Sequence, residues 1–64
     1  MAPHFLDVRG KIADAEAILE TYKDALSDAI RRGDKTEQNR YERLIEEQEN
    51  YIEGLRQRLT YGDV

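Results

Sequence analysis

The sequence predicts an all-α fold, an antiparallel two-helix hairpin of the coiled-coil type, in a single domain spanning residues 1–64. The first observation behind this prediction is an apolar repeat with alternating steps of three and four residues. Such a repeat gathers apolar side chains on one side of a helix. The second observation is the segment Arg32-Gly33-Asp34-Lys35, where a helix stop is followed directly by a helix start. A break this short indicates two helices that fold back against each other.

The first helix is predicted over about residues 4–32. Pro3 can occupy a first-turn position, where its missing N–H is not needed. Arg31 and Arg32 lie in the expected last turn, where they complement the carbonyl end of the helix dipole. Gly33 follows as a left-handed cap. The apolar repeat of this helix consists of Phe5, Val8, Ile12, Ala15, Leu19, Tyr22, Leu26 and Ala29.

The second helix is predicted over about residues 36–60, after a turn at 33–35 and before a short tail at 61–64. Asp34 can cap this helix, and Glu37 stands three residues later, as a capping box requires. The apolar repeat then continues with the same steps through Tyr41, Leu44, Gln48, Tyr51 and Leu55.

Gln48 interrupts the apolar repeat of the second helix. The short turn should place Gln48 opposite Tyr22, whose hydroxyl the amide can then reach. A polar residue at such a position commonly fixes the register or the oligomeric state. The alternative is a core that is hydrated near its rim, and the sequence leaves both interpretations open.

The apolar surface is wider than a two-helix contact needs. Strict patterning at two positions of seven suits a helix pair, whereas an added flanking position suits a bundle. We therefore expect a second copy or a partner protein to complete a helical bundle. The expected partner-binding residues are Ile18, Ile45, Ile52 and Leu59 on the widened surface, with Phe5, Leu6 and Val8 at the N-terminal end beyond the reach of the second helix.

In its length and its two-helix outline, the chain resembles the plasmid repressor-of-primer family, whose small hairpins dimerise into four-helix bundles. The resemblance is one of architecture. It implies a dimeric bundle, and no RNA-binding residue is carried over from it.

Composition restricts the classes of partner. Charged residues make up 38% of the chain and the net charge is −4, which disfavours direct binding to nucleic acid and to anionic membranes. No apolar run approaches the roughly 20 residues that cross a bilayer, and the first residues do not resemble a secretory signal. There is no cysteine, so disulfides cannot support so small a core. We expect a cytoplasmic protein, or a component of a particle assembled inside the cell.

No arrangement of residues suggests catalysis. His4 and Asp7 are one helical turn apart, but two ligands fall short of the four that a structural zinc site normally has. The chain has one serine, dispersed glycines and no phosphate-binding loop. We therefore expect no enzymatic activity, no metal and no cofactor.

An acidic stripe of four residues runs along the second helix beside the apolar repeat: Glu42, Glu46, Glu49 and Glu53. Such a stripe is commonly a solvated flank. The functional interpretation is a surface that docks on a basic protein groove. The sequence thus predicts a small protein–protein interaction module, either a structural or adaptor subunit of a larger assembly, including a viral one, or a self-associating hairpin. The alternative is an acidic inhibitor that covers the nucleic-acid-binding surface of a target protein.

Overall fold

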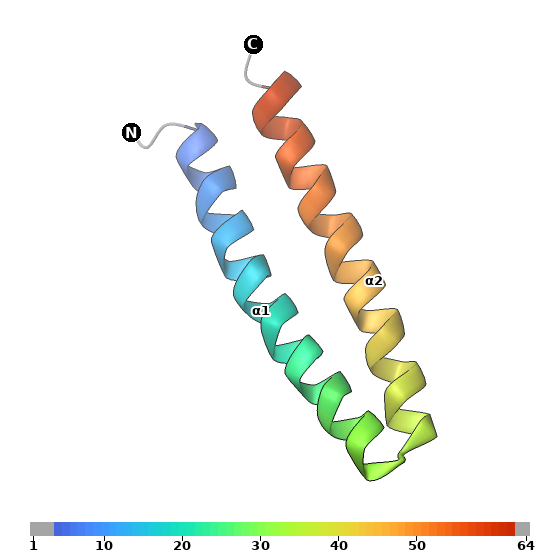
Figure 1. Ribbon diagram of the computed structural model, residues 1–64. Helices are drawn as coiled ribbons and strands as arrows, with labels where there is room; N and C mark the ends of the chain where they lie inside the picture. The colour runs from blue at the N-terminus through green and yellow to red at the C-terminus, as the bar shows by residue number, and fades with distance from the viewer. Residues whose placement is uncertain (1–3, 63–64) are drawn as a thin grey trace.

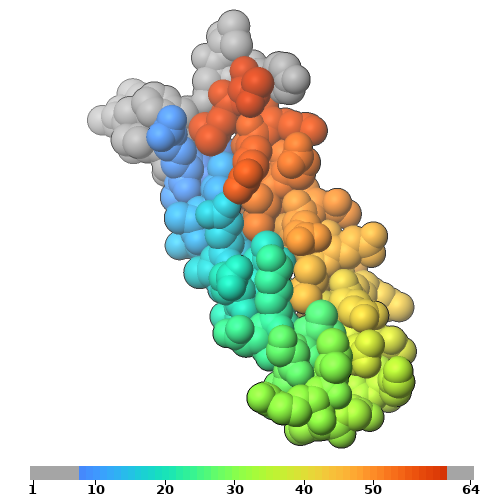
Figure 2. Space-filling view, viewed as in Figure 1, coloured from blue at the N-terminus to red at the C-terminus, as the bar shows by residue number. Residues whose placement is uncertain are grey.

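The computed structural model describes the backbone of residues 4–62 and the side chains of residues 8–60. It contains two long helices, α1 (His4–Arg32) and α2 (Lys35–Gln57), followed by a short π-helical segment, η1 (Arg58–Gly62). The long helices lie side by side and run in opposite directions, so the chain leaves and returns at the same end of a rod (Figure 1). The rod measures 48 × 17 × 12 Å (Figure 2). The described residues form no strand, and the predicted all-α hairpin is confirmed.

The turn between the helices is held by interlocking caps. Gly33 has a φ of 74°, in the left-handed region that glycine adopts without steric cost. Its N–H donates to the carbonyl of Ile30 at 3.1 Å, and the N–H of Asp34 donates to the carbonyl of Ala29 at 2.9 Å, which is the Schellman pattern. Asp34 then caps α2, because its carboxylate accepts a hydrogen bond from the N–H of Glu37 at 3.1 Å. Asp34 therefore caps both helices: its N–H closes the end of α1, and its carboxylate caps the start of α2.

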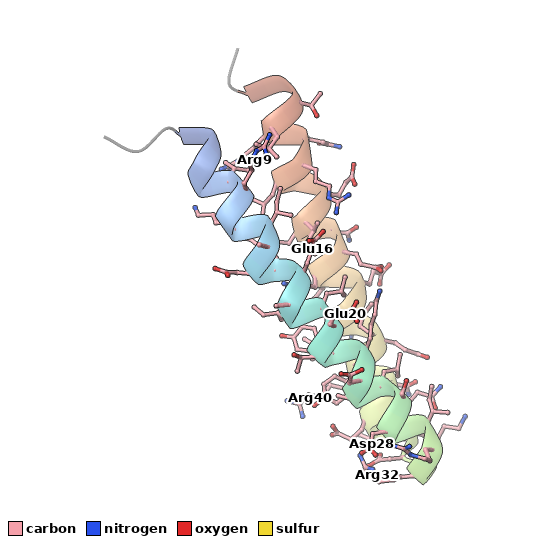
Figure 3. All side chains as sticks on the ribbon, turned by 60° about the vertical axis from the view of Figure 1, so that its left-hand side comes forward. Arg9, Glu16, Glu20, Asp28, Arg32 and Arg40 are labelled. Carbon is pink, nitrogen blue, oxygen red and sulfur yellow. The ribbon has the colours of Figure 1, made fainter. Side chains whose placement is uncertain are left out.

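Ion pairs surround the same turn. The Asp28 carboxylate accepts hydrogen bonds from Arg31 at 3.0 Å and from Arg32 at 2.8 Å, and Figure 3 shows Asp28 and Arg32 together at the turn end of α1. A second carboxylate, that of Asp34, lies 3.8 Å from the Arg32 guanidinium. The hydrogen bonds from Arg31 and Arg32 hold the pKa of Asp28 below its ordinary value, because they stabilise the ionised carboxylate.

The hydrophobic core of the hairpin is thin. Among the described side chains, none of the large ones is completely buried. Two of the buried residues are alanines, which allow the helices to approach closely. A core this small leaves much of the stability to capping and to local helical interactions. The buried apolar residues are Val8, Ala15, Ala29, Ile52 and Leu55.

The helix α2 is rotated relative to the sequence-based expectation. Ile52 is only 6% exposed, whereas Tyr51, expected in the contact with α1, is 51% exposed. Ile52, which the sequence pattern assigns to the widened partner-binding surface, is instead buried within the hairpin itself. The physical reason is that an isoleucine can be buried without a polar partner, while a buried tyrosine must satisfy its hydroxyl. The inner positions after the turn are Tyr41, Ile45, Gln48, Ile52 and Leu55 on α2 and Leu59 on η1, of which only Ile52 and Leu55 are fully buried.

The end of the rod away from the turn, which we call the open end, carries η1. The α-helical part ends at Gln57, and the N–H of Arg58 donates to the carbonyls of Gly54 and Leu55. The segment η1 contacts both α1 and α2. Val8 is only 3% exposed, so its expected place on a docking surface is wrong: it belongs to the core of the hairpin. The chain continues beyond α2 as η1 and packs against α1, which gives this end of α1 more cover than the sequence suggested.

Candidate protein-interaction surface

One face of the hairpin carries two stripes of residues at steps of seven, a spacing that returns each stripe to nearly the same side of its helix. We call this surface the groove face. It consists of Lys11, Ile18, Ala25 and Arg32 on α1, of Glu37, Leu44 and Tyr51 on α2, and of Arg58 at the start of η1.

The centre of the groove face is apolar and exposed. Ile18 is 45% exposed and Tyr51 is 51% exposed, and both line one hollow of about 260 Å³ between the helices. A second hollow of about 350 Å³ shares Lys11 and Tyr51 with the first and extends to Arg58. Together the two hollows form a shallow groove that runs along the hairpin toward its open end.

The ends of the groove face differ in charge. Lys11 and Arg58, both exposed, line the groove at the open end. At the turn end, Glu37 lies 3.6 Å from Arg40, and Arg32 is already paired with acidic neighbours. The groove face thus has an apolar centre, an open end with two cations, and a turn end with a carboxylate beside a neutralised arginine.

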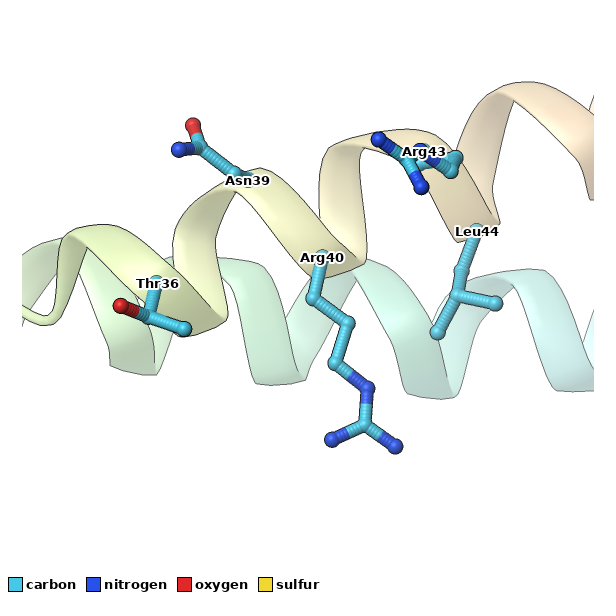
Figure 4. Close-up of a pocket in the computed structure, with 5 residues that line it drawn as sticks. All are labelled: Thr36, Asn39, Arg40, Arg43 and Leu44. Atoms are coloured by element: carbon cyan, nitrogen blue, oxygen red, sulfur yellow. The ribbon is translucent and has the colours of Figure 1, made fainter.

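Another hollow, of about 400 Å³, lies near the turn and is lined by residues of α2 alone: Thr36, Asn39, Arg40, Arg43 and Leu44. In Figure 4 the side chains of Arg40 and Arg43 point to different sides of the helix. Because the two guanidinium groups diverge, they do not form a clamp for an anion. This hollow therefore offers less to a ligand than the interhelical groove does.

The four members of the predicted acidic stripe are all exposed. Only Glu42 has a side-chain partner in the described part of the chain, a hydrogen bond from Gln38 at 3.3 Å. The nearby Arg56 instead pairs across the hairpin with Glu16. The stripe is therefore a solvated row of carboxylates that is not neutralised by ion pairs within residues 8–60.

The structure separates the predicted partner-binding residues into three groups. Ile18 is exposed, while Ile45 on α2 and Leu59 on η1 are half-buried. Ile52 and Val8 are buried within the hairpin itself. The side chains of Phe5 and Leu6 lie outside the described residues, so their predicted docking role stays a prediction.

Of the eight residues of the groove face, only Ile18 is among the partner-binding residues expected from the sequence. Tyr51 and Arg58 are two of the others, and both line its hollows. The apolar repeat places Tyr51 in the contact between the helices, and it does not include Arg58. The signal that identifies Tyr51 is the strict spacing of Leu44, Tyr51 and Arg58, which lies one position away from Ile45, Ile52 and Leu59. A tyrosine is also well suited to a surface that is half apolar and half hydrated.

Within the described residues, no three histidine or acidic side chains gather as ligands of a metal ion would. None of the described helices combines the length and the apolar character that crossing a membrane requires. No protein-family model, curated protein or solved structure matches this chain.

Proposed function

We propose that this chain is a non-enzymatic protein–protein interaction module whose groove face docks on another polypeptide, as a structural or adaptor subunit. The observation that carries this proposal is the exposure of Ile18 and Tyr51 together, at the centre of a groove between the two helices. Large aromatic and aliphatic side chains in a central groove, with charged residues around them, are the usual composition of a protein-binding surface.

The size of the exposed surface supports the same proposal. The chain exposes 4982 Å², whereas a compact monomer of 7.5 kDa is expected to expose about 4,250 Å². The excess of about 730 Å² is close to the roughly 800 Å² that each partner buries in a typical protein complex. Docking would therefore bring the hairpin near the exposed area of a compact domain.

Sedimentation equilibrium combined with thermal melts, both over a range of protein concentrations, tests this function. We expect a species heavier than one chain, with a melting temperature that rises with concentration, or else a poorly folded isolated chain that needs its partner. A stably folded monomer with a steep two-state melt, unchanged by concentration, would contradict the proposal.

A second candidate function is supported by the unneutralised stripe of Glu42, Glu46, Glu49 and Glu53. Four exposed carboxylates in a row resemble the charge pattern that a basic, nucleic-acid-binding surface recognises. With polylysine as the probe, this inhibitor function predicts strong binding at low salt that is lost at high salt.

The stripe can be separated from overall charge by two matched variants. The first replaces all four stripe glutamates by glutamine. The second neutralises four other exposed carboxylates, those of Asp14, Glu20, Asp24 and Glu47, by the corresponding amides. If the stripe is a recognition surface, only the first variant loses polylysine binding. Equal loss in both variants would show that net charge alone is responsible.

A further inference from the structure

The groove-face stripe on α2 and the start of η1 has charges that complement those of an identical stripe running in the opposite direction. From the turn outward its residues are acidic, apolar, apolar and basic: Glu37, Leu44, Tyr51 and Arg58. If a second copy lies on it in the opposite direction, the carboxylate of Glu37 faces the Arg58 guanidinium of the other copy. Leu44 then faces Tyr51, and each of these contacts occurs twice.

The stripe on α1 is compatible with the same arrangement. Its central pair is Ile18 and Ala25, so reversal places a large side chain against a small one at both positions. Such alternation of large and small residues allows layers of a bundle to interdigitate. Its outer pair is Lys11 and Arg32, and the charge of Arg32 is already offset by ion pairs with Asp28 and Asp34.

We infer that the partner of the groove face is a second copy of this chain, packed antiparallel to the first across a two-fold axis to form a four-helix bundle. This inference rests on the proposed function and specifies its partner. A two-fold arrangement buries the same surface on both copies, so the assembly closes at two chains. The excess exposed area of each chain is about that of one side of a standard interface.

Charge decides the relative direction of the two copies. In a parallel dimer the two open ends coincide, and Lys11 and Arg58 of both copies, four cations in all, would lie together. Like charges placed opposite each other at an interface are unfavourable. The antiparallel arrangement separates these cations and brings each Arg58 to the Glu37 carboxylate of the other copy, where it adds to the pairing of that carboxylate with Arg40 at 3.6 Å. We therefore assign the antiparallel direction.

A charge-swap experiment tests the pairing of Glu37 with Arg58. Glu37→Arg alone and Arg58→Glu alone each place like charges opposite each other twice per dimer, and each should weaken self-association about tenfold. An equimolar mixture of the two variants restores opposite charges at both positions, so a heterodimer should form with nearly the original affinity. The double variant Glu37→Arg/Arg58→Glu should also recover. Circular dichroism verifies that every variant remains helical.

Glu20→Arg is the matched control, because Glu20 is exposed on α1 and lies outside both the groove face and the acidic stripe. It makes the same charge change and should leave the dimer affinity nearly unaltered. Equal weakening by Glu20→Arg, or no recovery in the mixture, would overturn the assigned pairing.

The absence of cysteine allows the direction to be measured independently. Lys35→Cys introduces one attachment point for a spin label at the turn, where Lys35 is exposed. In the antiparallel dimer the two labels lie at opposite ends of the bundle, about 35–45 Å apart at 1.5 Å per helical residue. A separation below about 20 Å would place the turns together and overturn the antiparallel assignment.

The outcomes distinguish this inference from the proposed function. A parallel dimer, or a dimer insensitive to the charge swap, overturns the inference but leaves an interaction module. A chain that remains poorly folded and monomeric at high concentration overturns the second copy as partner and favours a different protein. A stable two-state monomer overturns both.

Discussion

The side-chain amide of Gln48 donates a hydrogen bond to the backbone carbonyl of Ala15 across the hairpin, with 3.0 Å between nitrogen and oxygen. Ala15 is 3% exposed and Gln48 is half-buried, so this polar contact lies within the apolar interface. The Ala15 carbonyl lies within α1, where the helix provides one donor, and Gln48 supplies a second. The acceptor is not the Tyr22 hydroxyl that the sequence suggested. Tyr22 instead contacts Tyr41, with ring centroids 6.2 Å apart.

The first prediction concerns the donor role of Gln48. Gln48→Glu keeps the shape of the side chain but, when ionised, directs a carboxylate toward a carbonyl oxygen. At pH 7 we expect a loss of about 1–3 kcal/mol in the free energy of unfolding, the cost of an unsatisfied or opposed polar group. Because the folded state should raise the pKa of the new carboxyl, the loss disappears below the unfolded pKa of about 4.3, where the group is protonated and can donate. Urea unfolding at several pH values measures this loss in the free energy of unfolding.

Asn50→Asp is the control for Gln48→Glu, because Asn50 is an exposed amide on α2 that makes no described hydrogen bond. It adds the same charge without touching the interface, so its stability should follow that of the parent chain across pH. If both variants lose the same stability at pH 7, added charge and not the lost donor is responsible.

The turn is the part of the fold that local sequence determines most directly. Gly33 supplies the left-handed residue and Asp34 supplies the cap, and both roles depend on backbone geometry within a few residues. Such short-range signals are readable without knowledge of the packing. The hairpin follows from them, because so short a connection between two long helices allows only an antiparallel pair.

The rotation of α2 is less accessible to sequence analysis because two sets of positions fit the same repeat. One set contains Tyr51 and the other contains Ile52, and both include Gln48 and Leu55. Periodicity cannot choose between sets that are one residue apart. The cost of burying a tyrosine hydroxyl favours the set with Ile52, and this chemical argument identifies the exposed position of Tyr51 and thus the groove face.

The second prediction compares three glycines. Gly33→Ala forces an alanine into the left-handed region and should destabilise the hairpin by about 1–2 kcal/mol. Gly10→Ala and Gly54→Ala should each stabilise it by about 0.8–1 kcal/mol, because both positions are within helices and an added Cβ meets no atom within 4 Å. Thermal melts of the three variants measure these changes in stability. Stabilisation by Gly33→Ala would show that the turn does not require a left-handed residue.

The third prediction tests the rotation of α2 with two neighbouring residues. Ile52→Ala removes a buried side chain and should cost about 2–5 kcal/mol at every protein concentration. Tyr51→Ala removes an exposed side chain and should change the stability of the isolated hairpin by less than about 0.5 kcal/mol. Tyr51→Ala should instead weaken association, so its effect appears only at concentrations at which chains associate. Unfolding curves at low and high concentration distinguish the two residues, and a reversed pattern would mean that Tyr51 is the buried one.

The last prediction follows from the lowered pKa of Asp28. Hydrogen bonds from Arg31 and Arg32 favour the ionised carboxylate in the folded chain, so the folded pKa lies below the unfolded value of about 3.9. The stabilisation is therefore fully present above the unfolded pKa and is lost as the pH falls through the folded pKa. Asp28→Asn should lower the unfolding free energy at pH 7, and the difference from the parent chain should shrink below about pH 4. Because the ion pairs are solvent-exposed, 0.5 M salt should reduce the same difference. Asp24→Asn removes an exposed carboxylate that forms no described ion pair and should show neither effect. A stability difference for Asp28→Asn that is constant from pH 7 to pH 2 would mean that the arginines do not stabilise the charged form.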